Sequence, residues 1–172
     1  DLTRAQWQQL IPVLAEREDL SISAEETFDT DLSDPARIEA ELLALADRAS
    51  ARLRAKSLAA GCIAVKVRRA DFATFTRQQQ IEPATQDGRV IGRAATDLLR
   101  RWRGEQPRAR IRLLGVGVSE LAPATQFDLF AAGAVPQPPP LDSALDAIRQ
   151  RFGEAGLRRA SGLPVGQRRP RR

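Results

Sequence analysis

The stretch that decides the fold is residues 63–78, IAVKVRRADFATFTRQ. In its first half, apolar residues occupy every second position from Ile63 to Val67, while Lys66 and Arg68 stand on the opposite parity. A period of two is typical of a strand that buries one face and leaves the other polar. This stretch therefore predicts a sheet with one apolar face and one face that carries cations.

Other strand candidates surround this stretch. Residues 69–71 predict a turn or bulge, and residues 73–78 continue with the composition of a second strand. Two further strands are predicted within residues 21–28, SISAEETF, and residues 111–118, IRLLGVGV. The imperfect alternation of the last one predicts a register break or bulge near Gly115.

Two amphipathic helices are predicted between the strands. Asp34 is the expected cap of the first helix, Pro35 suits its first turn, and Gly61 is the expected stop. Gly104 and Pro107 are expected to end the second. The apolar stripe of the first helix consists of Ile38, Leu42, Leu45, Ala49 and Leu53. That of the second helix consists of Ile91, Ala94, Ala95, Leu98 and Trp102.

The expected fold class is α+β, with the order β-α-β-β-α-β over residues 21–122. Because each helix has one apolar side, both should cover the same face of a four-stranded antiparallel-type sheet and leave the other face open. Residues 1–20 are interpreted as a linker with a short helix, and residues 123–140 as a Pro-rich connection. Residues 141–172 are expected to form a C-terminal extension of a short helix and an Arg-rich tail. The lack of Met suggests a piece of a longer protein.

The chain has 27 Lys and Arg against 22 Asp and Glu, a net charge of +5. This excess suits a nucleic-acid binder, but an Arg-rich genome would produce it as well, so the placement of the charges has to decide. On or beside the predicted strands, cations and hydroxyls gather in the pattern that phosphate and sugar contacts use. The candidate DNA-binding residues are Ser21, Ser23, Lys66, Arg68, Arg69, Thr74, Thr76, Arg77, Gln78, Arg110 and Arg112. The alternative interpretation is a merely solvated sheet face.

Several kinds of chemistry find no support in the sequence. There is no His, so imidazole bases and His-based metal sites are excluded, and the single Cys62 is expected to be buried. The acidic cluster within residues 25–34 is interpreted as a solvated loop and cap rather than a metal site, and no cofactor is predicted. No apolar run approaches the ~20 residues of a membrane helix, and we expect a cytoplasmic protein without catalytic residues of its own.

One further segment has the pattern of a docking peptide. Two large apolar anchors that follow a Gln, close to a Pro-rich stretch, suit insertion into a hydrophobic pocket. The candidate residues are Gln126, Phe127, Asp128, Leu129 and Phe130. The alternative is a strand-like segment that folds back onto the core.

Together these features resemble the little-finger domain of Y-family translesion DNA polymerases, in their bacterial DNA polymerase IV branch. The resemblance rests on residues 21–28, on residues 67–78, VRRADFATFTRQ, and on residues 111–121, IRLLGVGVSEL. It implies that the open sheet face contacts the phosphates of duplex primer-template DNA. It also implies that residues 126–130 bind the β sliding clamp, with Phe127 at a position that is more often Leu.

The resemblance further implies a division of labour within a longer chain. Palm, fingers and thumb domains of the parent chain would accompany this one, and the palm would hold Mg²⁺ and perform nucleotidyl transfer. Nothing that matches them occurs here, so we expect a non-catalytic fragment of an error-prone polymerase that serves lesion bypass and DNA repair. Two alternatives remain, namely an inactive Y-family adaptor and a free-standing module that binds RNA or single-stranded DNA.

Overall fold

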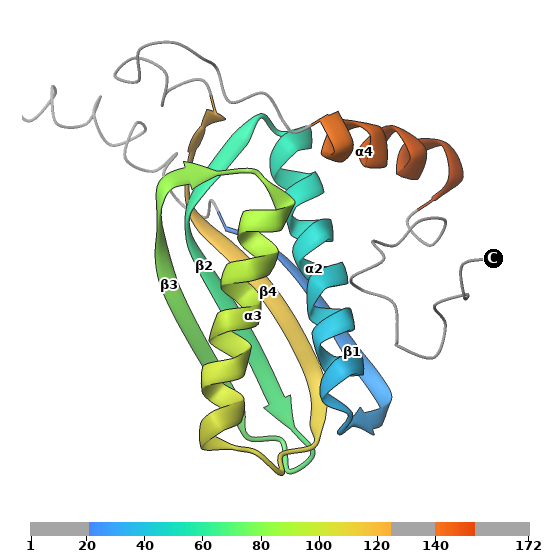
Figure 1. Cartoon of the computed structure of the whole chain (residues 1–172), viewed down its shortest axis with the longest axis vertical. Helices are drawn as coiled ribbons and strands as arrows, with labels where there is room; N and C mark the ends of the chain where they lie inside the picture. Colours follow the sequence, from blue (N-terminus) through green and yellow to red (C-terminus); the bar gives the residue numbers. More distant parts are fainter. Residues whose placement is uncertain (1–20, 125–139, 154–172) are drawn as a thin grey trace, which may run out of the picture.

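The computed structural model describes residues 21–124 and 140–153. Four antiparallel strands form one sheet in the order β1-β4-β2-β3, and α2 and α3 lie side by side on one face of it (Figure 1). The elements are β1 (Ile22–Leu32), α2 (Pro35–Ala55), β2 (Leu58–Arg69), β3 (Thr74–Thr85), α3 (Gly88–Glu105), β4 (Ile111–Pro123) and α4 (Pro140–Phe152). The predicted α+β class and β-α-β-β-α-β order are confirmed. No helix in these two described ranges is long and apolar enough to cross a membrane.

The core lies between the sheet and the two helices. All members of both predicted helix stripes are buried. They pack against the apolar side chains on the helix-facing side of the strands, for example Ile63, Val65 and Val116. Asp34 begins α2 as predicted, because its side chain accepts hydrogen bonds from the N–H of Ala36 at 3.4 Å and of Arg37 at 3.1 Å. Cys62 is buried, as expected for a thiol within a strand of the core.

Two predictions about glycines were wrong. Gly61 does not stop a helix, because α2 ends at Ala55 and Gly61 already lies inside β2. The strand register does not break at Gly115 either, since the pairing runs regularly through it. The register shifts instead between Arg68 and Arg69 of β2. Arg68 pairs with Leu113 and Arg69 with Ile111, so Arg112 of β4 is the extra residue of a bulge.

Helix α4 docks against the end of α2 through buried ionic groups. The Arg54 side chain is only 7 % exposed, and its Nε and Nη2 donate to Asp146 at 2.6 and 2.8 Å. Its Nη1 donates to Asp142 at 3.3 Å and to the backbone oxygen of Gln86 at 3.1 Å. Burial opposes the charge of Arg54, but the neighbouring carboxylates outweigh it and raise its pKa above the ordinary value.

The same carboxylates also attach α4 to the start of α3. Asp142 is fully buried and accepts the N–H of Gly88, the first residue of α3, at 3.2 Å. Arg149 of α4 reaches Asp47 of α2 at 3.4 Å. Among the large apolar side chains of α4, Leu145 is buried, whereas Leu141, Ile148 and Phe152 are exposed. The contact of α4 with the domain is therefore mainly ionic.

Candidate nucleic-acid interface

The sheet face away from the helices is lined by the polar side chains that alternate with the buried ones along the strands. Val65 and Val67 point to the helices, so Lys66, which lies between them, and Arg68, which follows Val67, point to the opposite, open face. On the neighbouring strand β3, Thr76 pairs with Lys66 and Thr74 with Arg68. Gln78 and Ser23 share this face, because they pair with Ala64 of β2 and Gly117 of β4. The candidate side chains on the open face thus come from β1, β2 and β3, with β4 lying between β1 and β2.

Lys66 already has an ionic partner on this face. Its Nζ lies 3.1 and 3.2 Å from the two carboxylate oxygens of Glu25, although β4 separates the strands that carry the two residues. Gly115 makes this contact possible, because it pairs with both residues and a Cβ there would stand 2.8 Å from Cγ of Glu25. Exposed pairs of this kind contribute about 0–1 kcal/mol, so a phosphate can compete with Glu25 for the ammonium group.

Arg68 and Arg112 occupy the end of the open face near the β2–β3 turn. Arg68 Nε donates to the hydroxyl of Thr74 at 3.0 Å. Arg112 Nε donates to Asp31 at 3.1 Å, and its guanidinium lies over the ring of Phe72, 4.8 Å from the ring centre. Phe72 is 64 % exposed, so this end also carries an aromatic surface, which was not predicted from the sequence.

Two of the candidate arginines lie on the other side of the sheet. Arg77 pairs with Val65 and therefore points toward the helices, where it forms an ion pair with Glu105 at 2.8 Å. Arg69 likewise turns to the covered side, where it contacts Asp71, the ring of Phe75 and, at 2.9 Å, the side chain of Gln106. The parity of a strand decides its face, so the prediction that these arginines lie on the open face was wrong.

The remaining candidates are placed near the edges of the site. Ser21 is exposed immediately before β1, and Arg110 is exposed in the loop before β4. Arg110 and Arg69 line an open pocket of about 500 Å³ between the β2–β3 turn and the α3–β4 loop. The hydrogen bond from Arg69 lowers the pKa of Asp71 below its ordinary value, so this carboxylate stays charged around neutral pH.

The open face also carries acids that the sequence analysis left out of the site. Glu25 and Asp31 neutralise Lys66 and Arg112, while Glu120 accepts a hydrogen bond from Gln80 at 2.7 Å. Such a surface is a set of exchangeable ion pairs rather than a continuous positive field. It can bind a polyanion wherever phosphates replace these carboxylates. In the part of the chain that the structure describes, no three His, Cys, Asp or Glu side chains gather as metal ligands.

The segment predicted to dock into a hydrophobic pocket, residues 126–130, lies outside the described residues, as do the linker at residues 1–20 and the Arg-rich tail. The structure therefore bears only on the sheet part of the predicted site. The last described residue before the segment is Ala124, whose N–H donates to the backbone oxygen of Ser57 at 2.9 Å. This hydrogen bond fixes the point at which the chain leaves β4.

Comparisons with known proteins agree with this fold. Residues 20–129 match the family model described as the impB/mucB/samB family C-terminal domain. Over 123 residues the chain is 47 % identical to the DNA polymerase IV of Streptomyces coelicolor, which covers 72 % of this chain and 25 % of that protein. Over 143 residues it is 36 % identical to the DNA polymerase IV of Dehalococcoides mccartyi (strain CBDB1), which covers 83 % of this chain and 36 % of that protein.

A solved structure with the same fold is a Y-family DNA polymerase chimera. It superimposes with a TM-score of 0.54 at 16 % sequence identity, over 68 % of this chain and 35 % of the chimera. This likeness concerns the fold alone. The chain spans only about a quarter to a third of the length of the curated relatives described above.

Proposed function

Because this chain belongs to the impB/mucB/samB C-terminal domain family, the little-finger domains of Y-family translesion DNA polymerases, we propose that it holds duplex primer-template DNA and recruits the β sliding clamp. The observation that carries the first half is the uncovered sheet face on which Lys66 and Arg68 alternate with the hydroxyls of Thr74 and Thr76. Guanidinium, ammonium and hydroxyl groups are the donors that bind phosphate oxygens.

Binding on this face works by exchange of partners. A phosphate that approaches Lys66 or Arg112 displaces the carboxylate of Glu25 or Asp31, and the counterions of the DNA are released. The groups involved are short or flexible and contact no fixed pattern of base edges. Binding is therefore indifferent to base sequence, which suits a domain that follows the duplex wherever a polymerase stops.

We expect that replacement of Lys66, Arg68 and Arg112 by Gln will lower the slope of log K against log salt by about 2 to 3, since each phosphate contact contributes about 0.9. Fluorescence anisotropy with a labelled duplex at several salt concentrations measures this slope. Glu25→Gln should tighten binding of the duplex by up to about fivefold, because it frees the ammonium group of Lys66 from its carboxylate partner.

A matched control for this experiment is Arg77→Gln, which removes a cation from the covered side of the sheet. Its effect on the salt slope should be small. If Arg77→Gln lowers the slope by as much per charge as the open-face variants do, the DNA contact lies elsewhere and the open-face proposal is wrong.

The second half of the proposal assigns residues 126–130, QFDLF, to the sliding clamp. Leu129 and Phe130 are the expected anchors, because large apolar side chains that fill pockets dominate the energies of such contacts. Replacing both by Ala should weaken capture on immobilised clamp by at least about 30-fold, while duplex binding stays unchanged.

The matched control for the clamp experiment removes the same two side-chain types elsewhere. Leu141 and Phe152 of α4 are exposed, so their joint replacement by Ala should leave clamp capture intact. Capture that survives the loss of Leu129 and Phe130 would mean that QFDLF is not the clamp peptide.

For the longer protein, we propose an error-prone polymerase of lesion bypass in the cytoplasm, whose palm, fingers and thumb domains lie outside this chain. The Mg²⁺ for nucleotidyl transfer is assigned to that palm, outside the residues of this chain. The alternatives are an inactive adaptor, which would lack metal-binding carboxylates in its palm, and a single-strand binder. The exposed ring of Phe72 gives the latter a stacking surface, and tighter binding of single strands than of duplex would favour it.

A further inference from the structure

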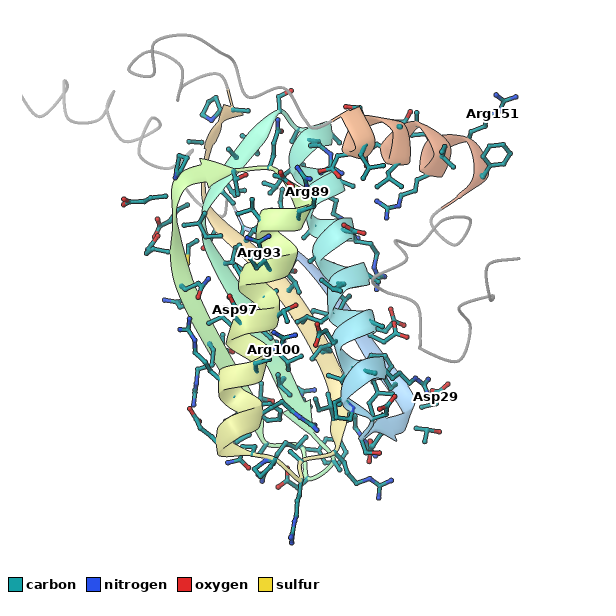
Figure 2. The ribbon with its side chains drawn as sticks, viewed as in Figure 1. Asp29, Arg89, Arg93, Asp97, Arg100 and Arg151 are labelled. Carbon is teal, nitrogen blue, oxygen red and sulfur yellow. The ribbon has the colours of Figure 1, made fainter. Side chains whose placement is uncertain are left out.

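The outer face of α3 carries a row of arginines that the proposed function does not use. Arg89, Arg93 and Arg100 lie along the side of α3 that faces away from the sheet, with Asp97 between them (Figure 2). Arg101 is also exposed, on the flank of α3 that faces β3, where it contacts Gln79. We call Arg89, Arg93, Arg100 and Arg101 the α3 ridge. With a rise of 1.5 Å per residue, the ridge is about 18 Å long.

The ridge arginines are only weakly engaged by the rest of the domain. Among the described residues, Arg93 makes no hydrogen bond or ion pair, and Arg89 reaches only Asp87, at 3.4 Å. Arg101 contacts the neutral side chain of Gln79 at 3.5 Å. Arg100 forms an ion pair with Glu39 of α2 at 3.1 Å, but its side chain remains 66 % exposed. The positive charge of this face is therefore directed mainly to solvent.

Packing does not require these arginines. The stripe that includes Ile91, Leu98 and Trp102 holds α3 on the sheet, and it points the opposite way. On the open sheet face Lys66 and Arg112 have carboxylate partners, and on the α3 ridge Arg89 and Arg100 have them too. Arg93 and Arg101, by contrast, form no ion pair among the described residues. The α3 ridge thus adds two arginines without a carboxylate partner to the helical side of the described domain.

We propose that the α3 ridge binds a second stretch of nucleic-acid backbone, so that one domain bridges two duplex segments. The ridge and the open sheet face lie on opposite sides of the domain, and a single straight duplex cannot contact both (Figure 1). The inference rests on the proposed function, because the first segment is the one held by the sheet. Arg is the side chain best suited to bidentate phosphate contacts.

A straight phosphate strand fits the ridge better than an acidic protein surface does. Protein interfaces usually have an apolar centre, but Val90 is the one large apolar side chain exposed among the described residues of α3. A row of about 18 Å spans roughly five phosphates of one strand, at about 3.4 Å of helix axis for each. The α3 ridge therefore provides a row of cations long enough for several phosphates, and it lacks the apolar centre that a protein partner would need.

The test is a bridging assay with two short duplexes of about 15 base pairs, one with a donor dye and one with an acceptor dye. The full chain should produce energy transfer between them at low salt. Replacing Arg89, Arg93 and Arg101 by Gln should reduce bridging about tenfold or more, because about three phosphate contacts are lost, while binding of the first duplex stays close to normal. Arg100 is left in place because it links α3 to α2.

Two matched changes separate the ridge from general charge effects. Arg37 of α2, Lys56 at the C-terminal cap of α2 and Arg151 of α4 are exposed, and their joint replacement by Gln removes the same charge elsewhere. This control should preserve most of the bridging. Asp97→Asn should strengthen bridging by a few fold, whereas Asp29→Asn on β1, far from α3, should have little effect (Figure 2).

The possible outcomes are distinct. Binding of one duplex without bridging, or bridging that the ridge variant retains, overturns the ridge and leaves the proposed function standing. Equal losses in the ridge and control variants also overturn it. Failure to bind any duplex overturns both. Poly-glutamate that binds the ridge as tightly as duplex does would assign this face to an acidic protein and reject the nucleic-acid proposal.

Discussion

Replacement of Arg54 by Met is expected to lower the free energy of unfolding by about 3 kcal/mol and to release α4 from the domain. The guanidinium is buried between Asp142 and Asp146, and its removal takes the ion pair at 3.3 Å from the buried Asp142 and leaves Asp146 with Arg149 at 3.9 Å. Breaking a buried ion pair by the loss of one partner typically costs about 3–5 kcal/mol. The lower figure is expected here because Asp146 is partly exposed, 22 % of its side chain, and can regain water.

Urea denaturation gives the change in free energy, and hydrogen exchange shows where it acts. The amides of α4 should lose protection first, followed by those at the start of α3, because Asp142 also accepts the N–H of Gly88. Arg37→Met is the matched control on the same helix. The Arg37 side chain is exposed, so its loss should change stability by less than about 0.5 kcal/mol. Unchanged protection of α4 in Arg54→Met would mean that the ionic network does not hold this helix.

The second large effect is expected at Trp102 in the centre of the core. The side chain is 1 % exposed and packs against Phe75, with the ring centres 5.8 Å apart. Trp102→Ala should cost about 3–5 kcal/mol, the usual range when a buried large aromatic is truncated and a cavity remains. The measurement is again urea denaturation followed by circular dichroism.

Trp102→Phe distinguishes the loss of volume from the loss of the indole N–H. Nε1 of Trp102 is buried and has no hydrogen-bond partner among the described residues, so the native side chain carries a desolvation cost. Phe keeps most of the packing and removes this donor, and we expect its cost to remain below about 1.5 kcal/mol. Equal destabilisation by Phe and Ala would indicate that the N–H has a partner, such as an ordered water, that stabilises it.

Much of the fold could be predicted because it follows from local periodicity. The stripe from Ile38 to Leu53 repeats every three to four residues, and a helix with such a stripe has to bury it. The alternation from Ile63 to Val67 likewise orients Lys66 and Arg68 to one face before any partner strand is known. The order of helices and strands then leaves few arrangements, and the four-stranded sheet with two helices on one face is one of them.

The site was less predictable, because it depends on partners that are distant in the sequence. Arg77 appeared to share a face with Lys66, but the register with Val65 turned it to the helices, and only strand pairing sets that register. Glu25 reaches Lys66 because Gly115 lies between them, and neither residue alone indicates this contact. Residues 126–130 remain a sequence prediction throughout.

The sequence by itself determined which segments are strands and helices, which residues of α2 and α3 form the core, and that one sheet face stays polar, because each of these depends on the spacing of apolar residues along a few turns or strand positions. Only the tertiary structure decided which cations are available to a phosphate. Charges interact through space, over a few ångströms and irrespective of sequence separation. Lys66 is therefore partnered by Glu25, Arg54 is buried beneath α4, and Arg89, Arg93 and Arg100 of the α3 ridge point outward to solvent.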